Sequence, residues 1–245
     1  MLEAATATWP EVATYVQENP TAIWPLGATE QHGPHLPLAT DTLLAEALAR
    51  RVAREVGGLL LPPLPLSYSW VWRDIPGTLT LRVETFLAVV KDVVRSLQRT
   101  GIRAALLVNG HAANQQPLKY ALRELADELT LPILYVFYPG LEEVTRDTTL
   151  SPRWQPHTFH ACEIETSLFL AVCPALCRPE RAVREYPPVP PHFERSALSM
   201  GHLSQSGVFG DATVADAERG QAWWEAVVQE TVHLWREFLA QHDLP

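Results

Sequence analysis

The stretch AIWPLGATEQHGPHLPLATDTLLAEALARRVAREVG, residues 22–57, joins an apolar run, a polar loop and a helical pattern. Residues 22–26 have the length and composition of a short buried strand. From residue 43 onward, apolar side chains recur at the spacing of an amphipathic helix, and Gly57 and Gly58 provide its end. A strand, a loop and a helix in succession indicate the beginning of an α/β fold.

The same succession recurs along the chain. It predicts a mostly parallel sheet with helices on both faces. A proline-rich stretch without a clear period, residues 184–207, predicts a long ordered loop or lid. Further strands are predicted at residues 59–61, 104–108 and 132–139, and further helices at 82–101, 115–129 and 211–242, the last with a break near Gly220.

The composition favours one domain, residues 1–245, because the chain is 47% hydrophobic and long enough for one sizeable core. A net charge of −9 gives no general attraction to nucleic acid or to an anionic membrane. The three cysteines form no CxxC pair, which is typical of reduced thiols in a cytoplasmic protein. No signal-peptide pattern is present, and no apolar run approaches the ~20 residues that span a bilayer.

Polar side chains gather in two loops that directly follow predicted strands. The first loop holds Glu30, His32, His35 and Asp41 within residues 28–41, and the second holds Asn109 and His111 around a glycine. Parallel strands bind ligands beyond their carboxyl ends, so these loops are expected to lie side by side. A third cluster, in residues 157–165, contributes His157, His160, Glu163 and Glu165.

Histidine nitrogens and carboxylate oxygens are the donors that divalent metal ions use in hydrolases, and two ions close together usually share a bridging carboxylate. Taken singly, each residue has an ordinary explanation: Asp41 precedes a helix and is equally consistent with a helix cap. The occurrence of histidine and acidic residues together at three places along the chain favours a metal site. No Walker-type or GxGxxG loop supports nucleotide chemistry.

Several motifs resemble the creatininase family, the creatinine amidohydrolase-like hydrolases. The resemblance extends from about residue 20 to about residue 235. It rests on PLGATEQHGPHLPLATD (25–41), IPGTLTL (75–81), VNGHAANQQ (108–116), HACEIETSLFLAV (160–172) and SGVFGDATVADAERG (206–220).

The resemblance implies a three-layer α/β/α sandwich, two divalent metal ions per subunit (zinc, manganese or iron) and a homo-oligomer, commonly a hexamer. It implies that Glu30 and His111 bind one metal, that His32 binds the other, and that Asp41 bridges them. His160 would be the acid/base group that protonates the leaving nitrogen, or the group that orients the substrate.

Glu165 would be a further metal ligand, or a carboxylic acid that contacts the ligands without binding a metal. Creatininases place an aromatic residue and a metal-binding glutamate after the NGH histidine, where this chain has Ala112 and Ala113. Glu163 or Glu165 would then have to replace the metal-binding carboxylate that is missing at position 113. Creatininases also place Trp-Asp where this chain has Pro156 and His157, which argues against creatinine as the substrate. NGHAAN is closer to the NGHGGN of other branches, which include formamidopyrimidine deformylases and the mycofactocin peptidase.

The remaining candidates are supporting residues. Trp72, Arg73 and His157 are interpreted as substrate-binding, although core or interface packing explains the tryptophan equally well. His35, Asn109 and Glu163 are interpreted as residues that contact the metal ligands. A nucleophilic role for Cys162 is not favoured, because a metal-bound hydroxide would already serve.

The sequence therefore predicts a metal-dependent amidohydrolase acting on a C–N amide bond of a small substrate, such as a cyclic amide or a formamide. Two alternatives remain open. One is a peptidase that acts on a short peptide terminus. The other is a catalytically silent, metal-containing oligomeric binding protein. The missing carboxylate at Ala113 supports this alternative.

Overall fold

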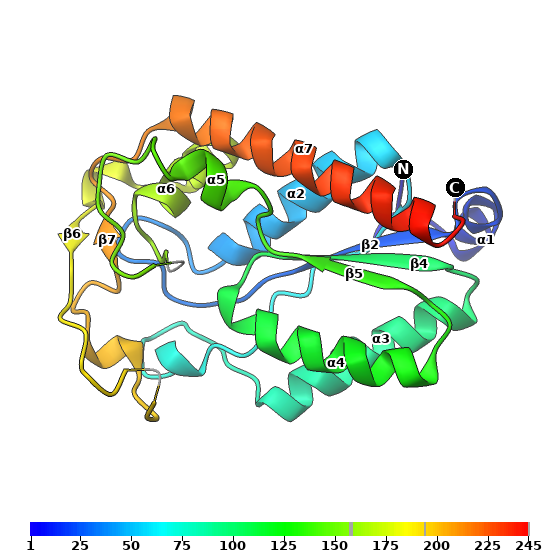
Figure 1. The fold of residues 1–245 in the computed structure, drawn as a ribbon, viewed down its shortest axis with the longest axis horizontal. Helices are drawn as coiled ribbons and strands as arrows, with labels where there is room; N and C mark the ends of the chain where they lie inside the picture. Colours follow the sequence, from blue (N-terminus) through cyan, green and yellow to red (C-terminus); the bar gives the residue numbers. More distant parts are fainter. Residues whose placement is uncertain (157–158, 194, 245) are drawn as a thin grey trace.

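The computed structural model describes residues 1–156, 159–193 and 195–244. A five-stranded parallel sheet forms the centre of the molecule (Figure 1). The strand order is β1 (Leu2–Glu3), β3 (Leu59–Leu60), β2 (Thr21–Leu26), β4 (Ala104–Asn109) and β5 (Ile133–Val136).

The two central strands, β2 and β4, are buried at every position. They pair in parallel from Thr21 opposite Ala104 to Leu26 opposite Asn109. Near-continuous apolar runs of this kind are typical of parallel strands that are covered on both faces.

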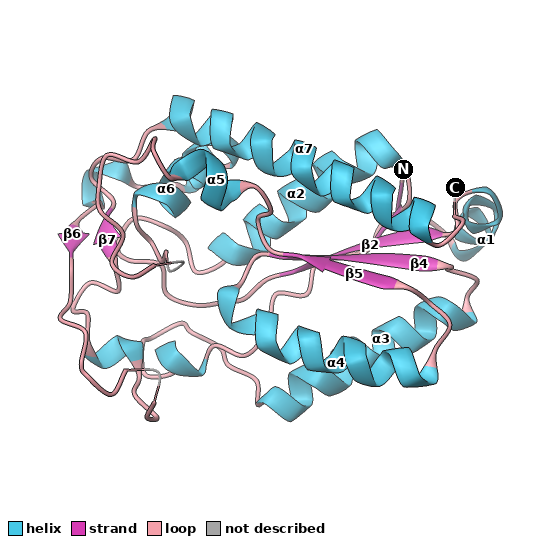
Figure 2. Ribbon diagram, in the orientation of Figure 1, coloured by secondary structure: helices cyan, strands magenta, loops and turns pink. Residues whose placement is uncertain are grey.

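Helices cover both faces of the sheet, as Figures 1 and 2 show. Alternate residues of the strands enter two separate hydrophobic clusters, so that Ile23 and Leu106 pack on one side and Trp24 and Leu107 on the other. The predicted three-layer α/β/α architecture is therefore confirmed. One layer holds α2 (Thr40–Val56), α5 (Leu141–Thr145), α6 (Glu163–Val172) and α7 (Ala217–Gln241), the other holds α3 (Val83–Arg99) and α4 (Gln115–Glu128), and α1 (Trp9–Glu18) lies near the termini.

Two predictions for the last helix were wrong. The last helix starts at Ala217 instead of residue 211, because the Asp211 carboxylate accepts hydrogen bonds from Thr213 and forms a local turn. The same helix is not broken at Gly220. A Cβ there would lie 1.9 Å from the Ser167 carbonyl oxygen, so glycine lets α7 pack closely against α6.

The strand predicted at residues 132–139 ends at Val136, since Tyr138 has a left-handed φ of 43° and turns the chain toward α5. The proline-rich stretch is irregular, as predicted. In its described residues, the regular structure is β6 (Arg184–Glu185), which pairs with β7 (Gly210–Asp211), and a helical turn at Met200–His202. In the described chain, no helix has the length and apolar character needed to cross a membrane.

Candidate metal centre

The candidate site lies beyond the carboxyl ends of β2 and β4, where the sequence places its two polar loops. The chains leaving the two strands are joined there, because the Gly110 amide donates to the Leu26 carbonyl at 2.8 Å. The first turn of α2 closes over this junction. A Cβ at Gly110 would lie 2.2 Å from the carbonyl oxygen of Asp41, so only glycine allows the approach.

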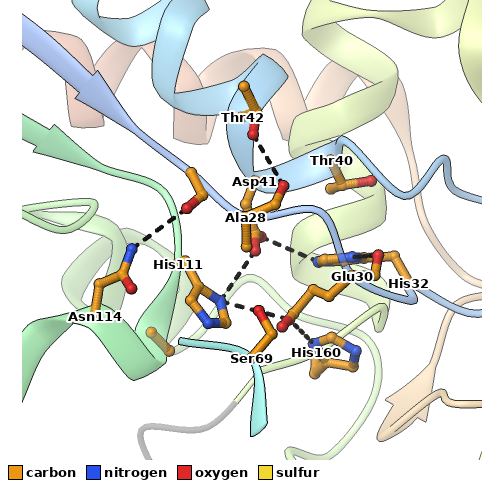
Figure 3. Close-up of polar contacts among 12 residues, drawn as sticks. Ala28, Glu30, His32, Thr40, Asp41, Thr42, Ser69, His111, Asn114 and His160 are labelled. Carbon is orange, nitrogen blue, oxygen red and sulfur yellow. Dashed lines mark hydrogen bonds and ion pairs between the residues drawn. The ribbon is translucent and has the colours of Figure 1, made fainter. Parts of the chain in front are cut away.

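Four segments of the chain bring the acidic and histidine side chains together, and Figure 3 shows those of the first three. Glu30 and His32 come from the loop after β2, Asp41 from the first turn of α2, and His111 from the loop after β4. Glu165 comes from the first turn of α6. All five side chains are almost completely buried.

Asp41 stands between the two histidines. Its Oδ1 lies 3.1 Å from His32 Nε2, and its Oδ2 lies 3.0 Å from His111 Nδ1. Glu30 Oε1 lies 3.5 Å from His111 Nδ1, and Glu165 Oε2 lies 3.6 Å from His32 Nε2. Two triads of donor atoms result, each within 4.8 Å, and they share the Asp41 carboxylate.

Backbone carbonyls set the tautomers of both histidines. His32 Nδ1 lies 3.1 Å from the Glu30 carbonyl oxygen, and His111 Nε2 lies 3.0 Å from that of Tyr68. Because a carbonyl only accepts, the ring N–H group faces it in each case. In the neutral ring, the other nitrogen has its lone pair and faces Asp41, which is the arrangement of a metal-binding histidine.

The carboxylates also fit a cation. Glu30 Oε2 is buried, and it has no hydrogen-bond partner among the residues that the structure describes. A buried polar atom without a partner costs free energy, and a bound cation would remove that cost. The donor set, two imidazole nitrogens and three carboxylates, suits divalent first-row metals.

The cluster has strongly perturbed pKa values. Burial raises the pKa of Glu30 to about 7. Burial also lowers the pKa of His111, but the charges of Glu30 and Asp41 outweigh this effect and raise it to about 9. The two neighbouring histidines hold the pKa of Asp41 well below its usual range, against the effect of burial. A cation that binds here would therefore displace protons.

His160 lies beside the shared cluster. Its Nδ1 is 3.9 Å from Glu30 Oε1, and its ring stacks on Trp72 with centroids 4.4 Å apart. Trp72, for which the sequence left substrate binding and packing open, is enclosed in the structure. The indole is 2% exposed. One face of it stacks on the His160 imidazole, and Phe209 packs edge-on against the indole.

Arg73, another predicted substrate contact, lies apart from the cluster. The Arg73 guanidinium stacks over the Trp70 ring at 3.8 Å and lies 3.5 Å from Asp74. The Arg73 guanidinium therefore interacts with neighbouring residues of its own segment. His157 lies outside the described residues.

Two predicted supporting residues do hold the loops. Asn109 Oδ1 accepts from the His111 amide at 3.1 Å, and Asn109 Nδ2 donates to the His111 carbonyl at 2.8 Å. His35 Nε2 lies 2.8 Å from Thr166 Oγ1, which ties the first loop to α6. Burial lowers the pKa of His35 to about 4, so its ring is neutral at neutral pH.

Glu163 and Glu165 point in different directions, since residues two apart on a helix lie about 200° apart around its axis. Glu163 accepts hydrogen bonds from Leu150 and Ser151 and lies 3.2 Å from Arg219. It fixes the 150–151 segment. Glu165 alone of the two faces His32, so it is the glutamate placed to offset the alanine at position 113.

Sequence reasoning missed two buried residues. Gln31 contacts His160 at 2.7 Å, and its place between Glu30 and His32 in the motif was the signal that could have found it. Tyr138 has a buried hydroxyl with no partner in the described part of the chain. Burial, together with the charges of Asp41 and Glu165, raises its pKa well above the usual value. Tyr138 lies in an apolar run that gave no such signal.

The chain matches the family model Creatininase, described as creatinine amidohydrolase, over residues 5–235. It is 30% identical to the creatinine amidohydrolase of Pseudomonas putida in an alignment of 248 residues that covers 94% of this chain and 94% of the relative. It is also 30% identical to the mycofactocin precursor peptide peptidase of Mycobacterium tuberculosis over 239 residues, covering 92% of this chain and 88% of the peptidase. A solved structure designated creatininase Mn superposes with a TM-score of 0.81 at 29% identity and covers 96% of this chain and 98% of its own.

Proposed function

The chain belongs to the creatininase family of hydrolases that act on C–N bonds, and on that premise we propose that it is a two-metal amidohydrolase for a small amide. The observation that carries this proposal is the Asp41 carboxylate, whose two oxygens face His32 and His111 in two adjoining triads. A shared carboxylate between two donor sets is the arrangement that a pair of metal ions needs.

Each ion would have three protein ligands. Glu30, Asp41 and His111 would hold one ion, and His32, Asp41 and Glu165 would hold the other. Zinc, manganese and iron all suit such a mixed nitrogen and oxygen donor set, and the likeness to a creatininase designated Mn supports manganese among them. When bound, such ions lower the pKa of a water molecule and polarise the carbonyl that it attacks.

The chain's own residues would supply the rest of the chemistry. Burial of Glu30, Asp41 and Glu165 excludes bulk water and strengthens the electrostatic interactions inside the site. Glu165 is held in place by the Ala161 amide, which donates to its Oε2 at 2.6 Å. His160 is placed to act on the amide as an acid/base group or as a hydrogen-bonding group that orients it.

The substrate we propose is a cyclic amide or a formamide. Ala112 and Ala113 replace two larger residues of creatininase, so creatinine itself is not the substrate that we favour. A peptidase acting on a short peptide terminus is the second candidate, and the 30% identity with the mycofactocin precursor peptide peptidase supports it. The position of Glu165 beside His32 makes a silent binding protein the weakest candidate. We further propose that residues 1–245 form one domain of a cytoplasmic homo-oligomer, a hexamer by analogy with the family.

A substrate panel tests the proposal. Untagged protein would be loaded with Zn²⁺, Mn²⁺ or Fe²⁺ and assayed against cyclic amides, formamides and dipeptides. Hydrolysis of the cyclic amides or formamides supports the proposal, and hydrolysis restricted to peptides favours the peptidase. Full metal occupancy without hydrolysis of any compound would favour the binding protein.

A further inference from the structure

The Gln31 side chain has a fixed orientation. Its Oε1 accepts a hydrogen bond from the Gly33 amide at 3.0 Å, and its Nε2 donates to the Gly207 carbonyl at 3.1 Å. A backbone amide can only donate and a backbone carbonyl can only accept. A flipped Gln31 amide would set donor against donor and acceptor against acceptor, so the two backbone groups determine which atom is which.

This orientation decides where His160 carries its proton. The Gln31 Nε2 group has a second hydrogen, and His160 Nε2 lies 2.7 Å from it. Two N–H groups cannot face each other at this distance, so His160 Nε2 must be the acceptor. A neutral ring then carries its proton on Nδ1. A doubly protonated ring would set an N–H group against Gln31.

The protonated nitrogen faces the cluster. His160 Nδ1 lies on the side of Glu30, 3.9 Å from its Oε1 (Figure 3). A substrate held beside the cluster would therefore meet an N–H donor from His160. This geometry also makes His160 unsuited to bind a metal through Nδ1, although it lies close to Glu30 and His32.

The surrounding packing leaves little freedom for another arrangement. Trp72 stacks on one face of the imidazole with an interplanar angle of 20°, and the Phe209 amide donates to the His160 carbonyl at 3.1 Å. Gly207 has a φ of +80°, and a Cβ there would lie 1.7 Å from Gln31 Oε1. Glycine at this position is therefore needed for Gln31 to approach.

We propose that Gln31 is a positioning residue that holds His160 as a neutral hydrogen-bond donor, with its Nδ1–H directed at the reacting amide. His160 then orients the carbonyl and stabilises the negative charge that develops on its oxygen, as donors of an oxyanion hole do. The catalytic consequence rests on the proposed function, whereas the position of the proton does not.

Nuclear magnetic resonance of ¹⁵N-histidine-labelled, Zn²⁺-loaded protein tests the proton position directly. A His160→Asn variant identifies the His160 signals. In the wild type, we expect Nδ1 to give the signal of a protonated nitrogen and Nε2 that of an unprotonated one. The opposite pattern in the wild type would overturn the proposal without any further variant.

Substitutions of Gln31 test whether this residue determines which nitrogen of His160 carries the proton. Gln31→Glu replaces the donor by an acceptor, so the proton should appear on His160 Nε2. Gln31→Met removes the amide at similar length and should give a mixture of the two ring forms. Gln17→Glu makes the same charge change on the exposed side of α1 and should leave the His160 signals unchanged. Signals of His160 that stay as in the wild type in both folded Gln31 variants would also overturn the proposal.

Activity separates this inference from the proposed function. If the wild type hydrolyses an amide, Gln31→Glu should lower kcat by about 10²-fold with little change in KM, because the proton moves to His160 Nε2 and the donor that acts on the transition state is lost. Gln31→Met keeps part of the Nδ1–H form and should lower kcat less. A wild type that shows no hydrolysis would refute the proposed function, while its spectrum would still decide the proton position.

Discussion

Replacing Glu165 by glutamine should remove one metal ion and leave the other. Glu165 Oε2 lies 3.6 Å from His32 Nε2 and belongs to the triad that it forms with His32 and Asp41. The other triad, which contains Glu30 and His111, does not include it. Glutamine keeps the size and an oxygen that can accept from the backbone, but it removes the charge.

The expected magnitude follows from metal linkage. Changes behind a metal ligand already weaken binding 10–100-fold, so loss of a charged ligand should cost about 100-fold or more. At a metal concentration 100 times Kd, an ion stabilises the wild type by about 2.7 kcal/mol. At the same concentration, a 100-fold weaker site would contribute only about 0.4 kcal/mol. The difference, about 2.3 kcal/mol, corresponds to a Tm gain that is smaller by about 5–9 °C in a chain of this size.

Glu163→Gln is the matched control, because it makes the same change two residues away on the same helix. Its carboxylate binds Leu150, Ser151 and Arg219 instead of the cluster. We expect it to destabilise the metal-free protein by about 1.5–3 kcal/mol, as expected when hydrogen bonds to a buried charge are lost, and to keep both ions.

Plasma emission analysis after dialysis and differential scanning calorimetry with and without metal would measure both variants. Two ions retained by Glu165→Gln, or one ion lost by Glu163→Gln, would refute the assignment of Glu165 to the second triad.

Four further predictions concern the supporting structure. Asp41→Ala should abolish metal binding and activity together; unchanged metal content by plasma emission would contradict the shared role of Asp41. Gly110→Ala should lower stability by at least about 1–3 kcal/mol, because the new Cβ would lie 2.2 Å from the Asp41 carbonyl oxygen, and a calorimetric Tm equal to that of the wild type would refute this contact. Trp72→Ala should cost about 3–5 kcal/mol by denaturant unfolding, since the ring is fully enclosed, whereas a cost below about 1 kcal/mol would indicate an exposed ring. Burial raises the pKa of Cys162 to about 11, so the thiolate forms only near that pH; iodoacetamide labelling followed by mass spectrometry should be slow at neutral pH, and rapid labelling there would be inconsistent with a buried thiol.

The sheet could be predicted from the sequence, and so could the part of the site that lies in the loops after β2 and β4. Strand ends of a parallel sheet meet at one edge, so Glu30, His32, Asp41 and His111 were expected together once their loops were placed after neighbouring strands. The structure gathers these four side chains, and the hydrogen bond from Gly110 to Leu26 shows how closely the two loops are joined.

The rest depended on three-dimensional detail that residue spacing does not carry. Sequence alone left open whether Glu163 or Glu165 faces the cluster, because the first residue of α6 and hence its helical phase were unknown. The same holds for Gln31 and His160, which lie 129 residues apart and meet only in the folded chain. Trp72 was likewise undecided, since an indole in a loop can pack inward or face a substrate.

Anomalous diffraction from crystals of the metal-loaded protein tests the central claim most directly. We expect two peaks in each subunit, about 3.5–4 Å apart, with the Asp41 carboxylate between them and His32 and His111 on opposite sides. A single peak, or peaks that do not contact Asp41, would contradict it.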